Sequence, residues 1–200
     1  MIRLPGKADA ASLTAAVALE SDPFYRAIAA GPDRPELRQA ALAQYFEYSI
    51  REGREAGRCV QLDDPGLGVA VWLLPQPADR AALMATKKRA FLADVLAAEG
   101  VRNYYQIVTF MHSRAQRIVA EGDWYLSIVA VNPAVQGQGI GAQLLAPTLA
   151  EADRHAISCY LETFSPRSHS FYERLGFKKR AQFREPTTDE TYTLMIRAPA

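Results

Sequence analysis

The sequence has little of the residues that hold metals or cross-link secreted proteins. Its 200 residues include two cysteines and three histidines. Cys59 and Cys159 lie far apart, each in an apolar run that is typical of a strand, and His112 and His155 are isolated on segments with helical patterning. We therefore expect two reduced, buried thiols, no metal site and no disulfide framework.

Long hydrophobic runs and an excess of one charge are also missing. No stretch of 18 or more apolar residues occurs, so we expect no membrane-spanning helix. Lys and Arg number 23 against 22 Asp and Glu, and a net charge of +1 offers no electrostatic footprint for nucleic acid or an anionic membrane. Arg3 and Lys7 precede an Ala-rich stretch, but Asp9 interrupts that flank and no clean cleavage site follows. We expect no signal peptide and a cytoplasmic protein.

The composition is that of a globular protein, with 49% hydrophobic and 22% charged residues. The length suits one compact domain, which we expect to span residues 1–200. The first half is mostly helical in pattern, with one antiparallel hairpin. The expected elements are a helix from Ala10 capped by Asp9, a short helix opened by Asp22-Pro23, a helix over 35–52 that Gly53 ends, hairpin strands at 58–62 and 66–74, and helical segments on either side of Gly100 between 78 and 120.

The second half alternates strands with helices. A buried strand at 124–131 leads through a loop to a helix, and the helix should cross over to a parallel neighbouring strand. The pattern predicts an α/β fold of the α+β type, a mixed sheet with helices packed on it. The remaining expected elements are a helix at 139–154, a strand at 157–163, a short helix at 166–175 and strands at 177–184 and 191–197.

Three glycines stand at alternate positions where the loop becomes a helix, namely Gly137, Gly139 and Gly141. Without Cβ atoms, successive backbone N–H groups stay accessible, and the helix dipole adds positive potential. Such a loop is suited to a phosphate or pyrophosphate, and a tight turn without a ligand is the less favoured alternative, because glycines in an opening helix turn lower its stability.

A dinucleotide-binding loop is one alternative. Gly137-x-Gly139-x-x-Ala142 fits its glycine spacing, and Glu162 stands near the end of the next strand, where a ribose-binding acid belongs. Against it, Asn132-Pro133 inserts a turn before the glycines, and too few residues follow Glu162 to complete a doubly wound sheet.

Two motifs together resemble the GNAT superfamily of N-acetyltransferases. Gln136-Gly-Gln-Gly139-Ile-Gly141 is similar to the family's acetyl-coenzyme A signature, and Tyr172-Glu-Arg-Leu-Gly176-Phe177 is similar to its second one. The flanking residues look like the puromycin N-acetyltransferase-like branch. The resemblance covers about residues 120–198, which would form the acetyl-coenzyme A-binding core of a GNAT fold with a central, mostly antiparallel mixed sheet. Residues 1–120 would then bind the acceptor.

The resemblance implies roles for individual residues. Backbone groups of the central strand would pair with the pantetheine arm, and the amides of the glycine loop would hold the pyrophosphate of acetyl-coenzyme A, the co-substrate. Tyr172 would protonate the departing thiolate. The expected coenzyme-binding residues are Val129, Ala130, Val131, Gln136, Gly137, Gln138, Gly139, Ile140, Gly141, Ala142, Ser165 and Ser168.

The sequence departs from this branch at its expected general base. Relatives commonly have Glu where Ser127 stands, and Asn where Ser165 and Ser168 stand. A serine hydroxyl cannot take a proton from an amine unaided. The base is therefore Glu162, or a water chain through Ser127, or none is needed because the amine arrives unprotonated.

The function expected from these features is acetyl transfer from acetyl-coenzyme A to a primary amine of a small molecule by direct attack. A non-catalytic acyl-coenzyme A-binding module is the alternative that Ser127 motivates. No motif identifies the acceptor, and the oligomeric state is open, with a homodimer as one expectation.

Overall fold

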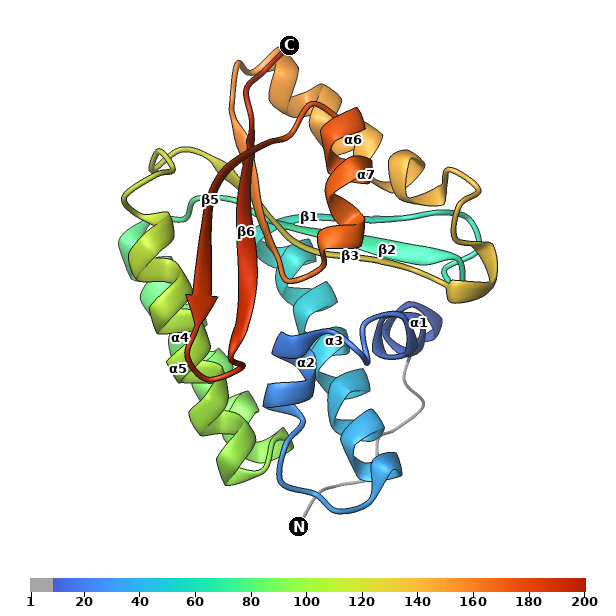
Figure 1. Ribbon diagram of the computed structural model, residues 1–200, viewed down its shortest axis with the longest axis vertical. Coiled ribbons are helices and arrows are strands. Elements are labelled where there is room, and N and C mark those ends of the chain that lie inside the picture. Colours follow the sequence, from blue (N-terminus) through green and yellow to red (C-terminus); the bar gives the residue numbers. More distant parts are fainter. Residues whose placement is uncertain (1–8) are drawn as a thin grey trace.

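The computed structural model describes residues 9–200 and places helices on both sides of one sheet (Figure 1). Arg3 and Lys7 lie outside the described residues. The helices are α1 (Ala10–Ala18), α2 (Pro23–Ile28), α3 (Pro35–Ala56), α4 (Ala78–Val95), α5 (Ala98–Ala115), α6 (Ile140–Arg154) and α7 (His169–Arg174), with short 3₁₀ turns η1 (Pro133–Val135) and η2 (Pro166–Ser168). The strands are β1 (Gly57–Gln61), β2 (Gly68–Leu73), β3 (Trp124–Val131), β4 (Cys159–Thr163), β5 (Lys178–Glu185) and β6 (Glu190–Arg197).

The six strands form a mixed sheet in the order β1-β2-β3-β4-β6-β5. β3 and β4 are parallel, as the expected crossover through α6 requires, and the other neighbouring pairs are antiparallel. The mixed α/β fold predicted from the sequence is confirmed. A doubly wound parallel sheet, which the dinucleotide-binding alternative needs, is not what the chain forms.

The two faces of the sheet carry separate hydrophobic cores. Along β2, Val69 and Val71 pack into the core that α1–α5 cover, whereas Ala70 and Trp72 pack into the core under α6 and α7. This alternation is the period of two that a strand buried on both faces must have. Figure 1 shows the band of β1–β3 between α6 and α7 on one side and α1–α3 on the other.

The two N-terminal helices begin where their caps predict. The carboxylate of Asp9 accepts a hydrogen bond from the Ser12 amide at 2.7 Å, and that of Asp22 accepts one from the Phe24 amide at 2.9 Å. Each carboxylate therefore satisfies an N–H group that has no partner within its helix.

Two glycines expected to interrupt helices do not. α3 continues through Gly53, and Gly100 lies inside the first turn of α5, so the break between α4 and α5 falls at Leu96 and Ala97. A Cβ atom on Gly53 would lie 2.6 Å from Val71 Cγ1, and one on Gly100 would lie 2.1 Å from the Ile28 carbonyl oxygen. These glycines allow close packing of helices on their neighbours, which outweighs their low helix propensity.

Within residues 9–200, none of the helices combines the length and the apolar character needed to cross a bilayer.

Candidate active site

The strands β3 and β4 part halfway along β3. They pair only from Trp124 to Leu126, while β3 stays paired with β2 as far as Val131. The backbone of residues 127–131 therefore has a strand partner on one side only. Figure 1 shows the result, with β5 and β6 running steeply across the direction of β1 and β2. This open edge can accept an extended ligand as a further strand would.

A β-bulge at Ser127 accompanies the parting. The register of β2 against β3 pairs Val71 with Ile128 and Trp72 with Leu126, which leaves Ser127 as the extra residue. Leu126 packs under α6 and α7, but Ile128 packs on the α1–α5 side, although residues two apart on a strand ordinarily share a face. The bulge thus reverses which side chains of β3 face each side of the sheet, because the extra residue shifts the alternation by one position.

The glycine loop lies at the end of this open edge. Gly137 and Gly139 both adopt left-handed backbone conformations, with φ of +81° and +82°, and α6 begins at the next residue, Ile140. A Cβ atom built on either glycine meets nothing within 4 Å, so the space before the loop is open. The side chain of Gln136 donates to the Val131 carbonyl at 3.1 Å and holds the loop against the strand. The first N–H groups of α6 are therefore available to an anion.

A cavity of about 1210 Å³ joins the open edge, the loop and the N-terminal helices. Of the residues predicted from the sequence, Gln138 is the exception and does not line it. The structure brings the others together around this cavity: Ser127, Val129, Ala130, Val131, Gln136, Gly137, Gly139, Ile140, Gly141, Ala142, Glu162, Ser165, Ser168 and Tyr172.

Tyr172 is buried, with its ring 5.1 Å from that of Phe171 and 5.9 Å from that of Phe177. Burial raises the pKa of its phenol above the usual value, and the nearby carboxylate of Asp22 adds to the rise. The phenol is therefore protonated at neutral pH and can donate a hydrogen bond. The sequence predicted that Tyr172 protonates the departing thiolate. A raised phenol pKa makes complete proton transfer harder, so we expect Tyr172 to donate a hydrogen bond to the developing thiolate.

Glu162 lies on β4 beside the stacked rings of Tyr125 and Tyr160, whose centroids are 4.8 Å apart. Burial raises the pKa of its carboxyl to about 7, and a hydrogen bond with Tyr125 opposes the rise. The Oε1 atom is buried and has no hydrogen-bond partner among the described residues. Such an orphaned oxygen at a cavity wall is able to receive a ligand donor.

A second carboxyl in the cavity, Asp22, was interpreted from the sequence only as a helix cap. Burial raises its pKa to about 6, against the stabilising amides of Phe24 and Tyr25. Its influence on the pKa of Tyr172 places it near that hydroxyl. The dipeptide Asp22-Pro23 gave only a local signal, since Tyr172 lies 150 residues away in the chain.

Side chains from residues 1–120 complete the lining of the cavity, and the sequence gave no motif for them. They include Phe24, Tyr25, Tyr45, Lys88, Tyr104, Met111 and His112. Arg167 and Arg174, in the segment that carries Ser165, Ser168 and Tyr172, add positive charge to the lining.

Comparison with known proteins agrees with this geometry. Residues 95–179 match the family described as an acetyltransferase (GNAT) domain. A crystal structure from Corynebacterium glutamicum, described as histone acetyltransferase HPA2 and related acetyltransferase, is 26% identical, with a TM-score of 0.63 over 99% of this chain and 95% of that one. The chain contains a GNAT acetyltransferase domain. It is an acetyl-coenzyme A-dependent acyltransferase, while membership of the puromycin-like branch stays a prediction.

More distant GNAT structures share the fold at lower identity. The polyamine N-acetyltransferase of Drosophila melanogaster is 15% identical, with a TM-score of 0.60 and 94% of each chain covered. Arylalkylamine N-acetyltransferase 2 of Aedes aegypti is 11% identical, with a TM-score of 0.60 over 99% of this chain and 98% of that one. At these identities the likeness concerns the fold alone.

Proposed function

We propose that this GNAT protein transfers the acetyl group of acetyl-coenzyme A to a primary amine of a small molecule by direct attack. The observation that carries the proposal is the single cavity, which connects an unpaired strand edge, a glycine loop, a buried phenol and two carboxyls of raised pKa. Residues 1–200 would act as one unit, with the coenzyme held by about 120–198 and the acceptor by the preceding part.

The coenzyme would bind mainly through the backbone. Its pantetheine arm would add to the open edge at Val129–Val131, and its pyrophosphate would accept hydrogen bonds from the loop and the first turn of α6. Arg167 and Arg174, which line the same cavity, would pair with coenzyme phosphates. The acetyl group itself comes with the co-substrate, so the protein must supply position, proton transfer and exclusion of water.

The chemical step removes one proton from the amine and leaves a negative charge on sulfur, which needs a hydrogen-bond donor. The amine nitrogen attacks the thioester carbon, the C–S bond breaks, and the thiolate leaves beside the Tyr172 hydroxyl, which donates to it. Of the two carboxyls, Asp22 affects the pKa of Tyr172, whereas Glu162 affects those of Tyr125 and Tyr160. We therefore place Asp22 nearer the departing sulfur and assign it the amine proton, with Glu162 as the alternative base.

The test is calorimetric titration of the purified protein with acetyl-coenzyme A, followed by a thiol-release assay over a panel of primary amines. We expect binding, and turnover with at least one amine. Binding without any turnover would favour the non-catalytic acyl-coenzyme A module, and absence of binding would contradict both. The cytoplasmic location and the homodimer stay predictions.

A further inference from the structure

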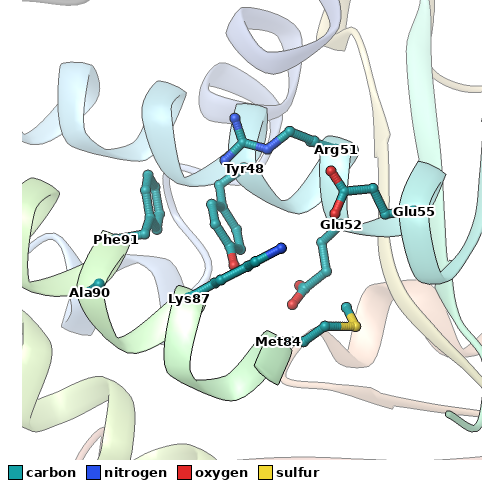
Figure 2. Close-up of a pocket in the computed structure, with 8 residues that line it drawn as sticks. All are labelled: Tyr48, Arg51, Glu52, Glu55, Met84, Lys87, Ala90 and Phe91. Atoms are coloured by element: carbon teal, nitrogen blue, oxygen red, sulfur yellow. The ribbon is translucent and has the colours of Figure 1, made fainter. Parts of the chain in front are cut away.

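A buried ion pair joins α3 to α4 at the lining of the large cavity. The ammonium of Lys88 on α4 donates to Glu52 Oε2 on α3 at 2.6 Å, and their side chains are 18% and 9% exposed. Lys88 lines the large cavity, but Glu52 lines a smaller one of about 410 Å³ between α3 and α4. Figure 2 shows this smaller cavity, with Glu52 between the two helices near Met84. The pair therefore lies between the two cavities, and its ammonium belongs to the residue that lines the large one.

An aromatic wall separates Lys88 from the reacting groups. The rings of Phe24, Tyr45 and Tyr104 lie 6.1 to 6.4 Å apart, and Tyr25 lies 6.0 Å from Tyr45. Phe24 and Tyr25 closely follow Asp22 in the chain, and the ring contacts run from Tyr25 through Tyr45 to Tyr104. Lys88 acts on the pKa values of Tyr45 and Tyr104, at the other end of this series of rings. The aromatic rings thus lie between Asp22 and the ammonium.

The ammonium still has hydrogen-bonding capacity. It carries three N–H donors, and Glu52 accepts one of them. Among the described residues, the ammonium also lies 5.8 Å from the centre of the Tyr48 ring and acts on the pKa of Tyr104. A donor that Glu52 does not use can meet an oxygen on a molecule that fills the cavity. A second positive charge on such a molecule would instead face the ammonium across a wall of low polarity, where like charges repel strongly.

We propose that Lys88 selects the acceptor: a primary amine with an aromatic body and an oxygen-bearing, uncharged or anionic far end, and not a diamine. The inference rests on the proposed amine acetylation and names its substrate class. The rings supply flat apolar contact for the body, and Lys88 supplies the hydrogen bond at its end. The carboxyls of Glu162 and Asp22 also line the cavity and could offset Lys88 by holding a second cation, so the test includes compounds that carry one.

The test compares kcat/KM for tyramine, 2-phenylethylamine, agmatine and putrescine. In the wild-type protein we expect tyramine to exceed 2-phenylethylamine, and both to exceed the two dications by about tenfold or more. Agmatine or putrescine as the best acceptor would overturn the proposal without any variant being made.

Variants then test whether Lys88 causes this order of acceptors. Lys88→Met combined with Glu52→Gln removes the ammonium without leaving a buried carboxylate unpaired. In this variant we expect tyramine and 2-phenylethylamine to have similar kcat/KM values. The ratio of their kcat/KM to that of agmatine and putrescine should fall about tenfold. Lys88→Arg should keep the wild-type order. The matched control is Lys87→Met, since Lys87 lines the smaller cavity and should not affect selection.

The outcomes separate this proposal from the general function. If no amine is acetylated although acetyl-coenzyme A binds, amine acetylation fails and the selection fails with it. If amines are acetylated but the folded double variant keeps the wild-type order, only the role of Lys88 is wrong. If the double variant does not fold, the order of kcat/KM among the four amines in the wild-type protein and in Lys88→Arg still tests the proposal. A different best acceptor in either protein would contradict it.

Discussion

The part of the cavity that we propose for the coenzyme and the part that we propose for the acceptor, called below the coenzyme side and the acceptor side, are built from different groups. On the coenzyme side, a loop and one strand present backbone atoms, and they come from one continuous segment, residues 127–142. On the acceptor side, side chains converge from α2, α3, α4 and α5, which are far apart in sequence.

The contrast between backbone groups and side chains explains why only the coenzyme side carries a recognisable sequence motif. A backbone site constrains glycine positions and spacing, which a sequence pattern can record. A side-chain site depends on how helices pack, and the family match accordingly begins only at residue 95. If the comparison is correct, changes on the two sides should affect different steps.

The largest expected effect is on the acceptor side. Asp22→Asn keeps the cap on α2, because Asn caps as well as Asp, but cannot take the amine proton. We expect kcat/KM for the amine to fall by about 10²- to 10⁴-fold, the usual worth of a general base, with the coenzyme A Kd unchanged. Steady-state kinetics and calorimetry measure both. Glu162→Gln is the matched variant. A larger fall in kcat/KM in Glu162→Gln than in Asp22→Asn would show that Glu162 is the base.

Tyr172→Phe tests the boundary between the two sides. The substitution preserves ring packing against Phe171 and Phe177 and removes only the hydroxyl. We expect kcat to fall about 10²-fold, with little change in coenzyme A affinity. An unchanged kcat would leave Tyr172 as a core aromatic residue without a part in the reaction.

Gly139→Val should act on the coenzyme side alone. A branched residue at φ +82° is strained by roughly 1–2 kcal/mol, and its side chain would project into the open space before the loop. We expect the coenzyme A Kd to rise at least about tenfold, with the fold retained. Gly122→Val is the control, since a Cβ there meets nothing within 4 Å and Gly122 is not among the residues that line the cavity. An unchanged Kd would mean that Gly139 serves a turn only.

The smallest effect concerns stability rather than catalysis. Folding raises the pKa of Glu162 to about 7 and that of Asp22 to about 6, so the folded protein holds more protons than the unfolded chain between about pH 4 and 7. The free energy of unfolding of the ligand-free protein should therefore fall as pH rises through this range. Glu162→Gln should reduce that fall, as urea denaturation at pH 5 and pH 8 would measure. An equal fall in the variant would show that Glu162 does not contribute.

Most elements could be predicted because their signals are local. Asp9 and Asp22 cap helices through amides two or three residues away, and the hairpin of β1 and β2 follows from the turn residues between them. Gly53 and Gly100 misled the prediction, because each is required by a neighbour distant in sequence, Val71 and Ile28 respectively. A pattern along the chain cannot distinguish a glycine that ends a helix from one that lets two elements approach.

The strand β3 shows the same limit at the site itself. Residues 124–131 are a run of apolar and β-branched residues, so the sequence predicts one uninterrupted buried strand. The bulge at Ser127 becomes visible only from its register against β2, and that bulge turns the strand over where β4 leaves it. The unpaired edge thus depends on two strands that are separate in sequence.

The sequence by itself determined the glycine loop, the Tyr172 motif and the order of helices and strands, because each depends on backbone conformation and neighbours within a few residues. Tertiary structure alone decided the acceptor side. Asp22 has a raised pKa because other segments remove water from it, and Lys88 faces the cavity because Glu52 on another helix holds it there. Burial and charge pairing arise between elements, and no spacing along the chain encodes them directly.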